Sequence, residues 1–154
     1  MKIKIIDDDI QFMDSLKNTL TGEFDHVLID GSTSFEDEYD YDIYFLDIDM
    51  PYNGLEIARK IKSFNDDIIV IFVSFREDLI FEALQTFPYY FLMKKYLKEE
   101  LPIVINKIKK MLVNNQIDIY YKGKEISLDV SKILYIEKNG QYTHIVTEKN
   151  TYIV

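Results

Sequence analysis

The fold is decided by YDIYFLDIDMP, residues 41–51, in which a short apolar run ends abruptly in a carboxylate, Asp47. Residues Ile43–Leu46 have the length and the β-branched or aromatic character of a strand that is buried on both faces. Met50-Pro51 and the following Asn53-Gly54 are turn and helix-start signals. Asp47 is therefore predicted at the carboxyl end of a buried strand, where ligands bind in open α/β sheets. On this segment alone, a solvated loop aspartate is an equally good interpretation.

Length and composition predict a soluble globular protein of one full domain plus a fragment. The chain has 154 residues, of which 47% are hydrophobic and 29% are charged, and it contains no cysteine, which removes disulfide and thiolate chemistry. Its longest strongly apolar run, Ile68–Val73, is far shorter than the roughly 20 residues that cross a bilayer. We therefore expect no membrane segment, no signal peptide and a cytoplasmic location.

Charge is unevenly spread along the chain, although the net charge is −9. Residues 1–90 carry 20 acids and 7 bases, whereas residues 91–154 carry 7 acids and 11 bases. The acidic first part argues against nucleic acid as its direct partner and makes a metal cation a natural one. The last segment, residues 114–154, is balanced at five acids and five bases.

Strands and helices alternate through the first two thirds of the chain. The predicted strands are Ile3–Ile6, Val27–Ile29, Ile43–Leu46, Ile68–Val73 and Tyr90–Met93. Helical spacing begins at Ile10, Leu55, Glu77 and Leu101, with Pro102 in a first turn, while Ser34–Glu38 can form little more than one turn. The alternation predicts an α/β fold, in which helices cover both faces of a doubly wound parallel sheet through right-handed crossovers.

After Val113 the pattern changes to short alternating strands, so we place a boundary between a domain at 1–113 and a segment at 114–154. The predicted strands of this segment are Ile117–Tyr121, Glu125–Leu128, Ile133–Glu137, Tyr142–Thr147 and Thr151–Val154, with turns at Lys122-Gly123 and Asn139-Gly140. The segment is therefore expected to be antiparallel β structure.

Polar residues end four strands of the predicted parallel sheet: Asp7-Asp8, Asp47, Ser74 and Lys94. Because the carboxyl ends of parallel strands meet at one edge, we expect these side chains to lie together. Clustered carboxylates suit Mg²⁺, and a lysine and a hydroxyl beside the metal can hold the oxygens of a phosphoryl group. The acids of Asp7-Asp8-Asp9 can also serve as caps for the helix that follows.

Residues 1–113 resemble the receiver domain of two-component response regulators. The matching motifs are Ile5-Ile6-Asp7-Asp8-Asp9, Phe45-Leu46-Asp47-Ile48-Asp49-Met50-Pro51, Phe72-Val73-Ser74 and Phe91-Leu92-Met93-Lys94. The resemblance implies a flavodoxin-like (βα)5 fold with strand order 2-1-3-4-5. It also implies a signalling phosphoacceptor rather than an enzyme, with Mg²⁺-dependent self-phosphorylation and dephosphorylation.

The resemblance assigns roles to four acids. Asp47 is implied to be the phosphoacceptor. Asp8 and Asp47 are implied to bind Mg²⁺ directly, Asp7 is implied to help through water, and the backbone carbonyl of Asp49 is implied to complete the protein ligands.

Further roles fall on Ser74 and Lys94, which are implied to contact the phosphoryl oxygens, and on Phe91, the switch aromatic that acts with Ser74. A core aromatic is an equally good interpretation of Phe91. The chain departs from the family at Lys95, which replaces the usual proline and makes a cis bond there unfavourable. The loop Pro51–Gly54 is one residue shorter than usual, and the second helix is abbreviated.

Residues 116–154 resemble the beginning of a LytTR-type DNA-binding domain, through Ile133-Leu134-Tyr135-Ile136-Glu137 and the Asn139-Gly140 turn. Only the first part of such a domain is matched. DNA is therefore expected as a partner only through a complete LytTR domain, and no DNA-contact residue is assigned.

Three functions remain open at this point. The favoured one is a signalling switch, in which a histidine kinase donates its phosphoryl group to Asp47 and the added charge controls an output, implied to be transcription. The second is a haloacid-dehalogenase-like phosphatase that uses Asp47 and Asp49, although such enzymes carry this motif on their first strand. The third is a receiver that acts by protein contact, with the β segment as the arm of a homodimer and Thr151–Val154 as its open edge.

Overall fold

The computed structural model describes residues 1–154, with the exception of the Asn114 side chain. The chain divides into two compact units, Met1–Val104 and Ile105–Val154. The first unit holds a parallel sheet, and the second holds antiparallel strands. Among the described residues, no helix has both the length and the apolar character needed to cross a bilayer. The boundary at residue 113 stays a prediction.

The first unit is built on a five-stranded parallel sheet in the order β2-β1-β3-β4-β5, which confirms the predicted fold class and strand order. The strands are β1 Lys2–Ile6, β2 Leu28–Ser32, β3 Ile43–Leu46, β4 Ile69–Ser74 and β5 Tyr90–Met93. All four residues of β3 are buried, as expected of a central parallel strand covered on both faces. The register aligns Leu46 with Ile6 on one side and with Phe72 on the other.

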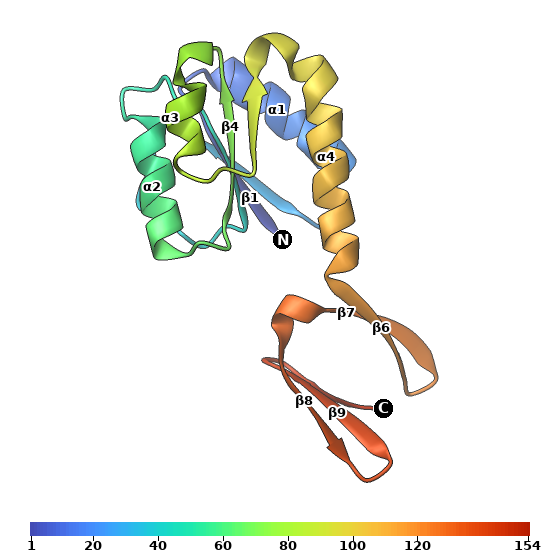
Figure 1. The fold of residues 1–154 in the computed structure, drawn as a ribbon. Helices are drawn as coiled ribbons and strands as arrows, with labels where there is room; N and C mark the ends of the chain where they lie inside the picture. Colours follow the sequence, from blue (N-terminus) through green and yellow to red (C-terminus); the bar gives the residue numbers. More distant parts are fainter. The chain divides into compact units, whose positions relative to one another are not determined.

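Helices cover both faces of this sheet (Figure 1), with α2 and α3 on one face and α1 and the beginning of α4 on the other. The α-helices are α1 Ile10–Glu23, α2 Gly54–Phe64, α3 Ile80–Leu84 and α4 Leu97–Asn114. Single 3-10 turns lie at η1 Glu77–Leu79, η2 Lys94–Tyr96 and η3 Val130–Lys132. Alternate residues of each strand supply the two apolar layers, because successive side chains point to opposite faces. Tyr44 and Leu46 of β3 belong to one buried cluster with Ile57 and Ile61 of α2 and Ala83 of α3.

The helix starts follow the predicted signals. Asp9 caps α1, since its side chain accepts a hydrogen bond from the amide of Phe12, and Asn53 caps α2 through the amide of Leu55. The prediction for Pro102 was wrong, because α4 begins at Leu97 and places this proline beyond the first turn. A proline there cannot donate the helical hydrogen bond to the carbonyl four residues earlier.

The expected turn of helix at Ser34–Glu38 is absent, and no residue from 33 to 42 is helical. Asp37 has a positive φ of 53°, which interrupts a right-handed helix. Aromatic side chains of this loop take the place of a helix and pack against the buried cluster, namely Phe35, Tyr39 and Tyr41. The missing helix is therefore compensated by aromatic side chains on an irregular backbone.

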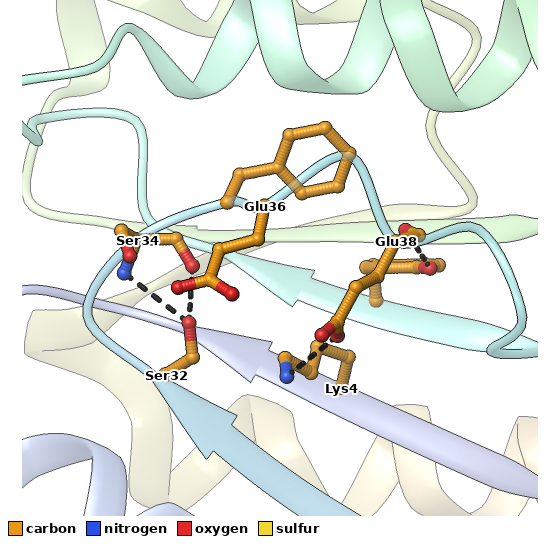
Figure 2. Close-up of a pocket in the computed structure, with 7 residues that line it drawn as sticks. Lys4, Ser32, Ser34, Glu36 and Glu38 are labelled. Atoms are coloured by element: carbon orange, nitrogen blue, oxygen red, sulfur yellow. Dashed lines mark hydrogen bonds and ion pairs between the residues drawn. The ribbon is translucent and has the colours of Figure 1, made fainter.

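Two polar contacts fasten this loop to the sheet. Figure 2 shows Lys4 of β1 and Glu38 pointing toward each other, and their ion pair spans 3.0 Å. The hydroxyl of the fully buried Tyr44 donates to the Glu38 carbonyl at 2.7 Å. Between loop and sheet lies a cavity of about 90 Å³, lined by Lys4, Ser32, Ser34, Phe35, Glu36, Glu38 and Tyr44. The loop thus has a fixed course over β1 and β3.

The second unit contains five antiparallel strands in two sheets, β6-β7 and β10-β9-β8. The strands are β6 Gln116–Tyr121, β7 Lys124–Asp129, β8 Ile133–Asn139, β9 Tyr142–Thr147 and β10 Thr151–Ile153. Ile119 and Leu128 of the sheet β6-β7 form a small buried cluster with Ile145 of the sheet β10-β9-β8. The predicted antiparallel segment is confirmed.

One hairpin turn differs from its prediction. Lys122 and Gly123 both have positive φ and join β6 to β7, as a type I′ turn requires. In the next hairpin Asn139 pairs with Tyr142, so the two-residue loop is Gly140-Gln141 rather than Asn139-Gly140. Gly140 alone has a positive φ there, which is the pattern of a type II′ turn with glycine at its first central position.

Candidate phosphoacceptor and metal site

The polar residues predicted at the strand ends lie together at the carboxyl edge of the sheet. Asp7 directly follows β1, and Asp47 directly follows β3, where its amide donates to the Ile6 carbonyl at 2.9 Å. Ser74 is the last residue of β4, and Lys94 follows β5 as the first residue of η2. The parallel register therefore assembles groups that are up to 87 positions apart in the sequence.

Three carboxylates form one cluster at this edge. Asp7, Asp8 and Asp47 each offer an oxygen atom, and these oxygens all lie within 4.8 Å of one another. Asp7 and Asp47 are buried, whereas Asp8 is exposed. An arrangement with two buried acids and one facing solvent could hold a hydrated metal ion, because Mg²⁺ keeps several waters when it binds to carboxylates.

The ammonium of Lys94 lies between the two buried acids. Its Nζ is 2.8 Å from Asp47 Oδ2 and 2.7 Å from Asp7 Oδ2, and the lysine side chain is 4% exposed. The rings of Phe12 and Phe75 lie 4.3 Å and 5.6 Å from Nζ, within the range of a cation–π contact. The cation thus lies buried between opposite charges and aromatic faces.

One oxygen of this cluster lacks a hydrogen-bond donor. Asp7 Oδ1 accepts the amide of Asp9 at 2.9 Å, but Asp7 Oδ2 is buried without a hydrogen bond. Lys94 is close enough to Oδ2 for an ion pair, although its angle does not make a hydrogen bond. A buried oxygen with an unused lone pair is costly on its own. This oxygen, together with the hard oxygen donors around it, fits a divalent cation or its water.

Burial and charge act against each other on these groups. Burial raises the pKa of the Asp7 carboxyl above its ordinary value, and the Lys94 ammonium and the Asp9 amide offset only part of this effect. Burial also acts to lower the pKa of Lys94, but its hydrogen bond to Asp47 and the charges of Asp47 and Asp7 outweigh burial, so this pKa is raised. Lys94 is therefore a cation at neutral pH, and the ionised form of Asp7 is held at a cost.

The loop after β3 fixes the Asp47 carboxylate through backbone contacts. The amide of Asp49 donates to Asp47 Oδ1 at 3.1 Å, and Gly54 lies against the Asp47 carbonyl. A Cβ atom on Gly54 would come within 2.1 Å of that carbonyl oxygen, far closer than any contact allows. Only glycine therefore lets α2 begin this close to the end of β3.

Ser74 and Phe91 occupy different environments. Ser74 is fully buried, and its Oγ accepts the amide of Arg76 at 3.2 Å, which leaves its own O–H to donate. Phe91 is half-buried and packs against the cluster that contains Phe72, with ring centroids 6.0 Å apart. The structure therefore places Ser74 at the carboxyl edge and Phe91 beside the core. The switch role of either residue stays a prediction.

Arg76 is a residue that the sequence did not single out. Its guanidinium makes two hydrogen bonds to Asp78, at 2.9 Å and 2.8 Å, and a third to Asp49 at 3.2 Å. These contacts link the loop after β4 to the loop after β3. A single arginine in a turn does not form a sequence motif. Only the fold shows that Arg76 connects the two loops.

A known protein family matches the part of the chain that carries this site. The model of the response regulator receiver domain covers residues 3–106, about two thirds of the chain. The chain belongs to this family. A receiver domain of a two-component system is a signalling domain, and the match favours it over the dehalogenase-like alternative.

Curated relatives share parts of the chain. The sensory transduction protein LytT of Oceanobacillus iheyensis is 37% identical over 83 residues, which is 52% of this chain and 34% of LytT. The transcriptional regulatory protein NatR of Bacillus subtilis is 28% identical over 158 aligned positions, which span 96% of this chain and 68% of NatR. The chain thus spans about a third of LytT and about two thirds of NatR.

Solved receiver structures share the fold of the first unit. One is the response regulator protein TrrA of Thermotoga maritima in complex with Mg(2+)-BeF. It is 26% identical, has a TM-score of 0.61, and covers 72% of this chain and 98% of its own. This likeness supports the assignment of the first unit to the receiver fold.

Proposed function

We propose that this receiver domain is a phosphorylation switch, in which a histidine kinase transfers a phosphoryl group to Asp47 in a Mg²⁺-dependent reaction. One observation carries the proposal: Asp7, Asp8, Asp47 and Lys94 converge at a single edge of the sheet. Phosphoryl transfer depends chiefly on positioning and charge neutralisation, and these four groups supply both. The chain then acts as a phosphoacceptor and not as an enzyme with a separate substrate.

The metal is held by the acids of the cluster in this proposal. Asp8 and Asp47 would hold Mg²⁺ through their carboxylates, Asp7 would help through water, and Asp49 would contribute its backbone carbonyl. When bound, Mg²⁺ supplies positive charge that neutralises the carboxylates and the phosphoryl oxygens. The buried Asp7 Oδ2, which has an ion pair with Lys94 but no hydrogen bond, supports this arrangement, as does the Mg(2+)-BeF complex of the related TrrA.

The transfer itself needs one new bond. An oxygen of the Asp47 carboxylate bonds to phosphorus while the bond from phosphorus to the kinase histidine nitrogen breaks. Lys94, already 2.8 Å from Asp47 Oδ2, turns to neutralise a phosphoryl oxygen. Ser74 donates its O–H to another oxygen and draws Phe91 into a changed position, which passes the change to the surface.

The expected output is transcription. NatR is named a transcriptional regulatory protein and aligns with nearly the whole chain. We infer that the second unit is the first part of a LytTR-type DNA-binding domain and that a complete domain reads the DNA. A cytoplasmic location follows from this pairing of a kinase partner with DNA, and it stays a prediction.

Intact-mass spectrometry tests the phosphoacceptor directly. The chain is incubated with a small acyl phosphate, with Mg²⁺ or with a chelator, and the added phosphoryl mass is followed. We expect labelling only with Mg²⁺, no labelling of Asp47→Asn, and normal labelling of Asp14→Asn, which removes an exposed acid outside the cluster. Equal labelling of the Asp47→Asn variant would move the phosphoacceptor to Asp8 or Asp49.

A further inference from the structure

Strand β8 is an uncovered edge of the sheet β10-β9-β8. Its side chains are exposed although several are apolar: Leu134 is 60% exposed, Tyr135 54% and Ile136 55%. Edge strands normally carry features that prevent pairing, because their free N–H and C=O groups bind any available strand. β8 carries two such features, the charges of Glu137 and Lys138 and a bulge at Leu134. Its uncharged and exposed stretch Leu134–Ile136 is the part that a second strand could cover.

The hydrogen bonds of β9 show which backbone groups of β8 are free. Thr143 exchanges both of its backbone hydrogen bonds with Val154, at 2.7 Å and 2.9 Å, so Thr143 faces β10 and not β8. Its β8 partner Lys138 therefore forms a non-hydrogen-bonded pair, and such pairs alternate with bonded ones. Ile136, two residues before Lys138, forms a non-hydrogen-bonded pair with Ile145 for the same reason. The N–H and C=O groups of Lys138 and Ile136 point outward.

The next residue in this series, Leu134, lies where the register slips. Ile133 pairs with Thr147 and Tyr135 pairs with Val146, so Leu134 is the extra residue of a β-bulge. It has no opposite residue on β9 in this register, and the bulge interrupts the ladder and bends the strand there. The regular part of the edge thus offers the backbone groups of Ile136 and Lys138, two residues apart.

We propose that two copies of this chain pair through their β8 strands, antiparallel, about a two-fold axis at Ile136. In this register Ile136 faces Ile136 of the second copy, and Leu134 faces Lys138 in both directions. The outward-facing backbone groups of the two Ile136 residues then bond to each other. The two-fold axis is perpendicular to the sheet, so facing residues lie on the same side, and the two sheets become one six-stranded sheet.

Charge selects this register over its neighbours. If the two-fold axis passed through Glu137 or Lys138 instead, that residue would lie directly opposite its own copy. Two like charges would then face each other, which is destabilising. A centre at Tyr135 would set Lys138 opposite Lys132. The centre at Ile136 instead sets Glu137 opposite Tyr135 and Lys138 opposite an aliphatic side chain.

The apolar side chains are continuous across the proposed contact. Ile136 pairs with Ile145, which is buried, and Ile145 pairs with Tyr152, so the three lie in a row on one face. Ile145 belongs to the buried cluster of the second unit, and Tyr152 packs against this cluster. Ile136, at the other end of the row, is exposed to solvent. A second copy extends this row with its own Ile136, Ile145 and Tyr152. A second copy is therefore the partner that the edge fits.

Sedimentation velocity of the full, unphosphorylated chain over a concentration series tests the pairing. We expect a reversible dimer, and a Kd at least ten times higher for Ile136→Lys, which sets two cations opposite each other. Tyr135→Lys should keep the dimer, since it sets a cation opposite Glu137 of the second copy. Ile153→Lys, on the outer edge of β10, should also leave the dimer unchanged.

Mixing two charge variants separates pairing from misfolding. Ile136→Lys and Ile136→Glu should each be monomeric with the circular dichroism spectrum of the parent, and their equimolar mixture should form a heterodimer. A monomeric parent, a dimer unaffected by Ile136→Lys, or a mixture that stays monomeric would overturn the proposal. Loss of the dimer in Ile153→Lys would overturn it too, by moving the interface to β10.

Discussion

Lys94 is the cation that pairs with both buried acids at the carboxyl edge of the sheet. It is almost fully buried and contacts both Asp7 and Asp47, so neither acid is compensated by solvent. Buried charges are stable only when paired, and one ammonium cannot fully neutralise two carboxylates with Asp8 nearby. Electrostatic repulsion between the carboxylates therefore remains at this edge, and a divalent cation bound there would reduce it.

The pH dependence of stability follows from the raised pKa of Asp7, whose main cause is burial. A carboxyl with a raised folded-state pKa costs stability when ionised, and this cost disappears as pH falls through the folded pKa toward the ordinary value of 3.8. We expect Asp7→Asn to be more stable than the parent at pH 7 without metal. Its advantage should shrink on acidification and vanish below the ordinary value. Urea unfolding at a series of pH values measures this difference.

With Mg²⁺ bound, we expect the parent chain to become more stable than Asp7→Asn. At ten times its Kd, a ligand that binds only the folded state adds about 1.4 kcal/mol, and Asp7→Asn should gain less than the parent. Asp14→Asn controls for the loss of one negative charge, because it lies exposed on α1. A metal-free Asp7→Asn that is less stable than the parent at pH 7 would show that Asp7 serves mainly to pair with Lys94.

At the scale of elements, the junction of β3 and α2 fixes the geometry around Asp47. A Cβ atom on Gly54 would meet the Asp47 carbonyl oxygen at 2.1 Å and the Ile48 Cα at 2.8 Å. Both are backbone atoms, so neither can rotate away. The helix can only respond by moving off the strand end, which displaces the loop that positions the carboxylate.

Gly54→Ala is therefore expected to destabilise the chain by about 1–3 kcal/mol, the usual cost of overpacking, and to slow phosphorylation of Asp47. Gly22→Ala is its matched control. Gly22 lies in α1, where an added methyl group would meet no other atom within 4 Å, so alanine there should stabilise the helix by about 0.5–1 kcal/mol. Urea unfolding and acyl-phosphate labelling of both variants check this pair. Equal stability of the two variants would mean that α2 shifts without cost.

For the whole molecule, the distribution of charge limits what the chain can bind by itself. The net charge is −9, and residues 114–154 carry five acids and five bases. Nonspecific DNA affinity comes from several lysine or arginine contacts to phosphates, and a balanced segment attached to an acidic unit supplies no such field. Dimerisation through β8 would double the charge without changing its balance.

We expect this 154-residue chain to bind DNA no more tightly than about 10⁻⁶ M at physiological salt, the usual limit of nonspecific binding, and without sequence preference. A fluorescence titration with two unrelated duplexes over a range of salt concentrations measures this. Charge reversal of Glu125 and Glu148 to lysine provides a control, since added cations should raise affinity equally for both duplexes. Tight binding of one duplex by the parent would show that the second unit is a complete DNA reader.

Local signals in the sequence predicted most of the fold and the members of the site. Strands β3 and β5 were located correctly. The helix-start signals Asp7-Asp8-Asp9 and Asn53-Gly54 contain the observed caps, Asp9 and Asn53. Both kinds of signal are local, because burial of apolar runs and capping act within a few residues. The gathering of Asp7-Asp8, Asp47, Ser74 and Lys94 was predictable for a related reason. In a parallel sheet, a polar residue that ends a strand must lie at the shared edge.

Tertiary packing decided the rest. The loop at 33–42 has aromatic residues that could line a helix, but their packing against the core is reached with an irregular backbone. The hairpin loop Gly140-Gln141 depends on strand register, which is set by cross-strand pairing rather than by the Asn-Gly signal. The bridge from Arg76 to Asp49 and the sharing of Lys94 between two acids depend on how separate loops and strand ends lie in space. Such contacts join distant positions, and no local pattern of residues encodes their distances.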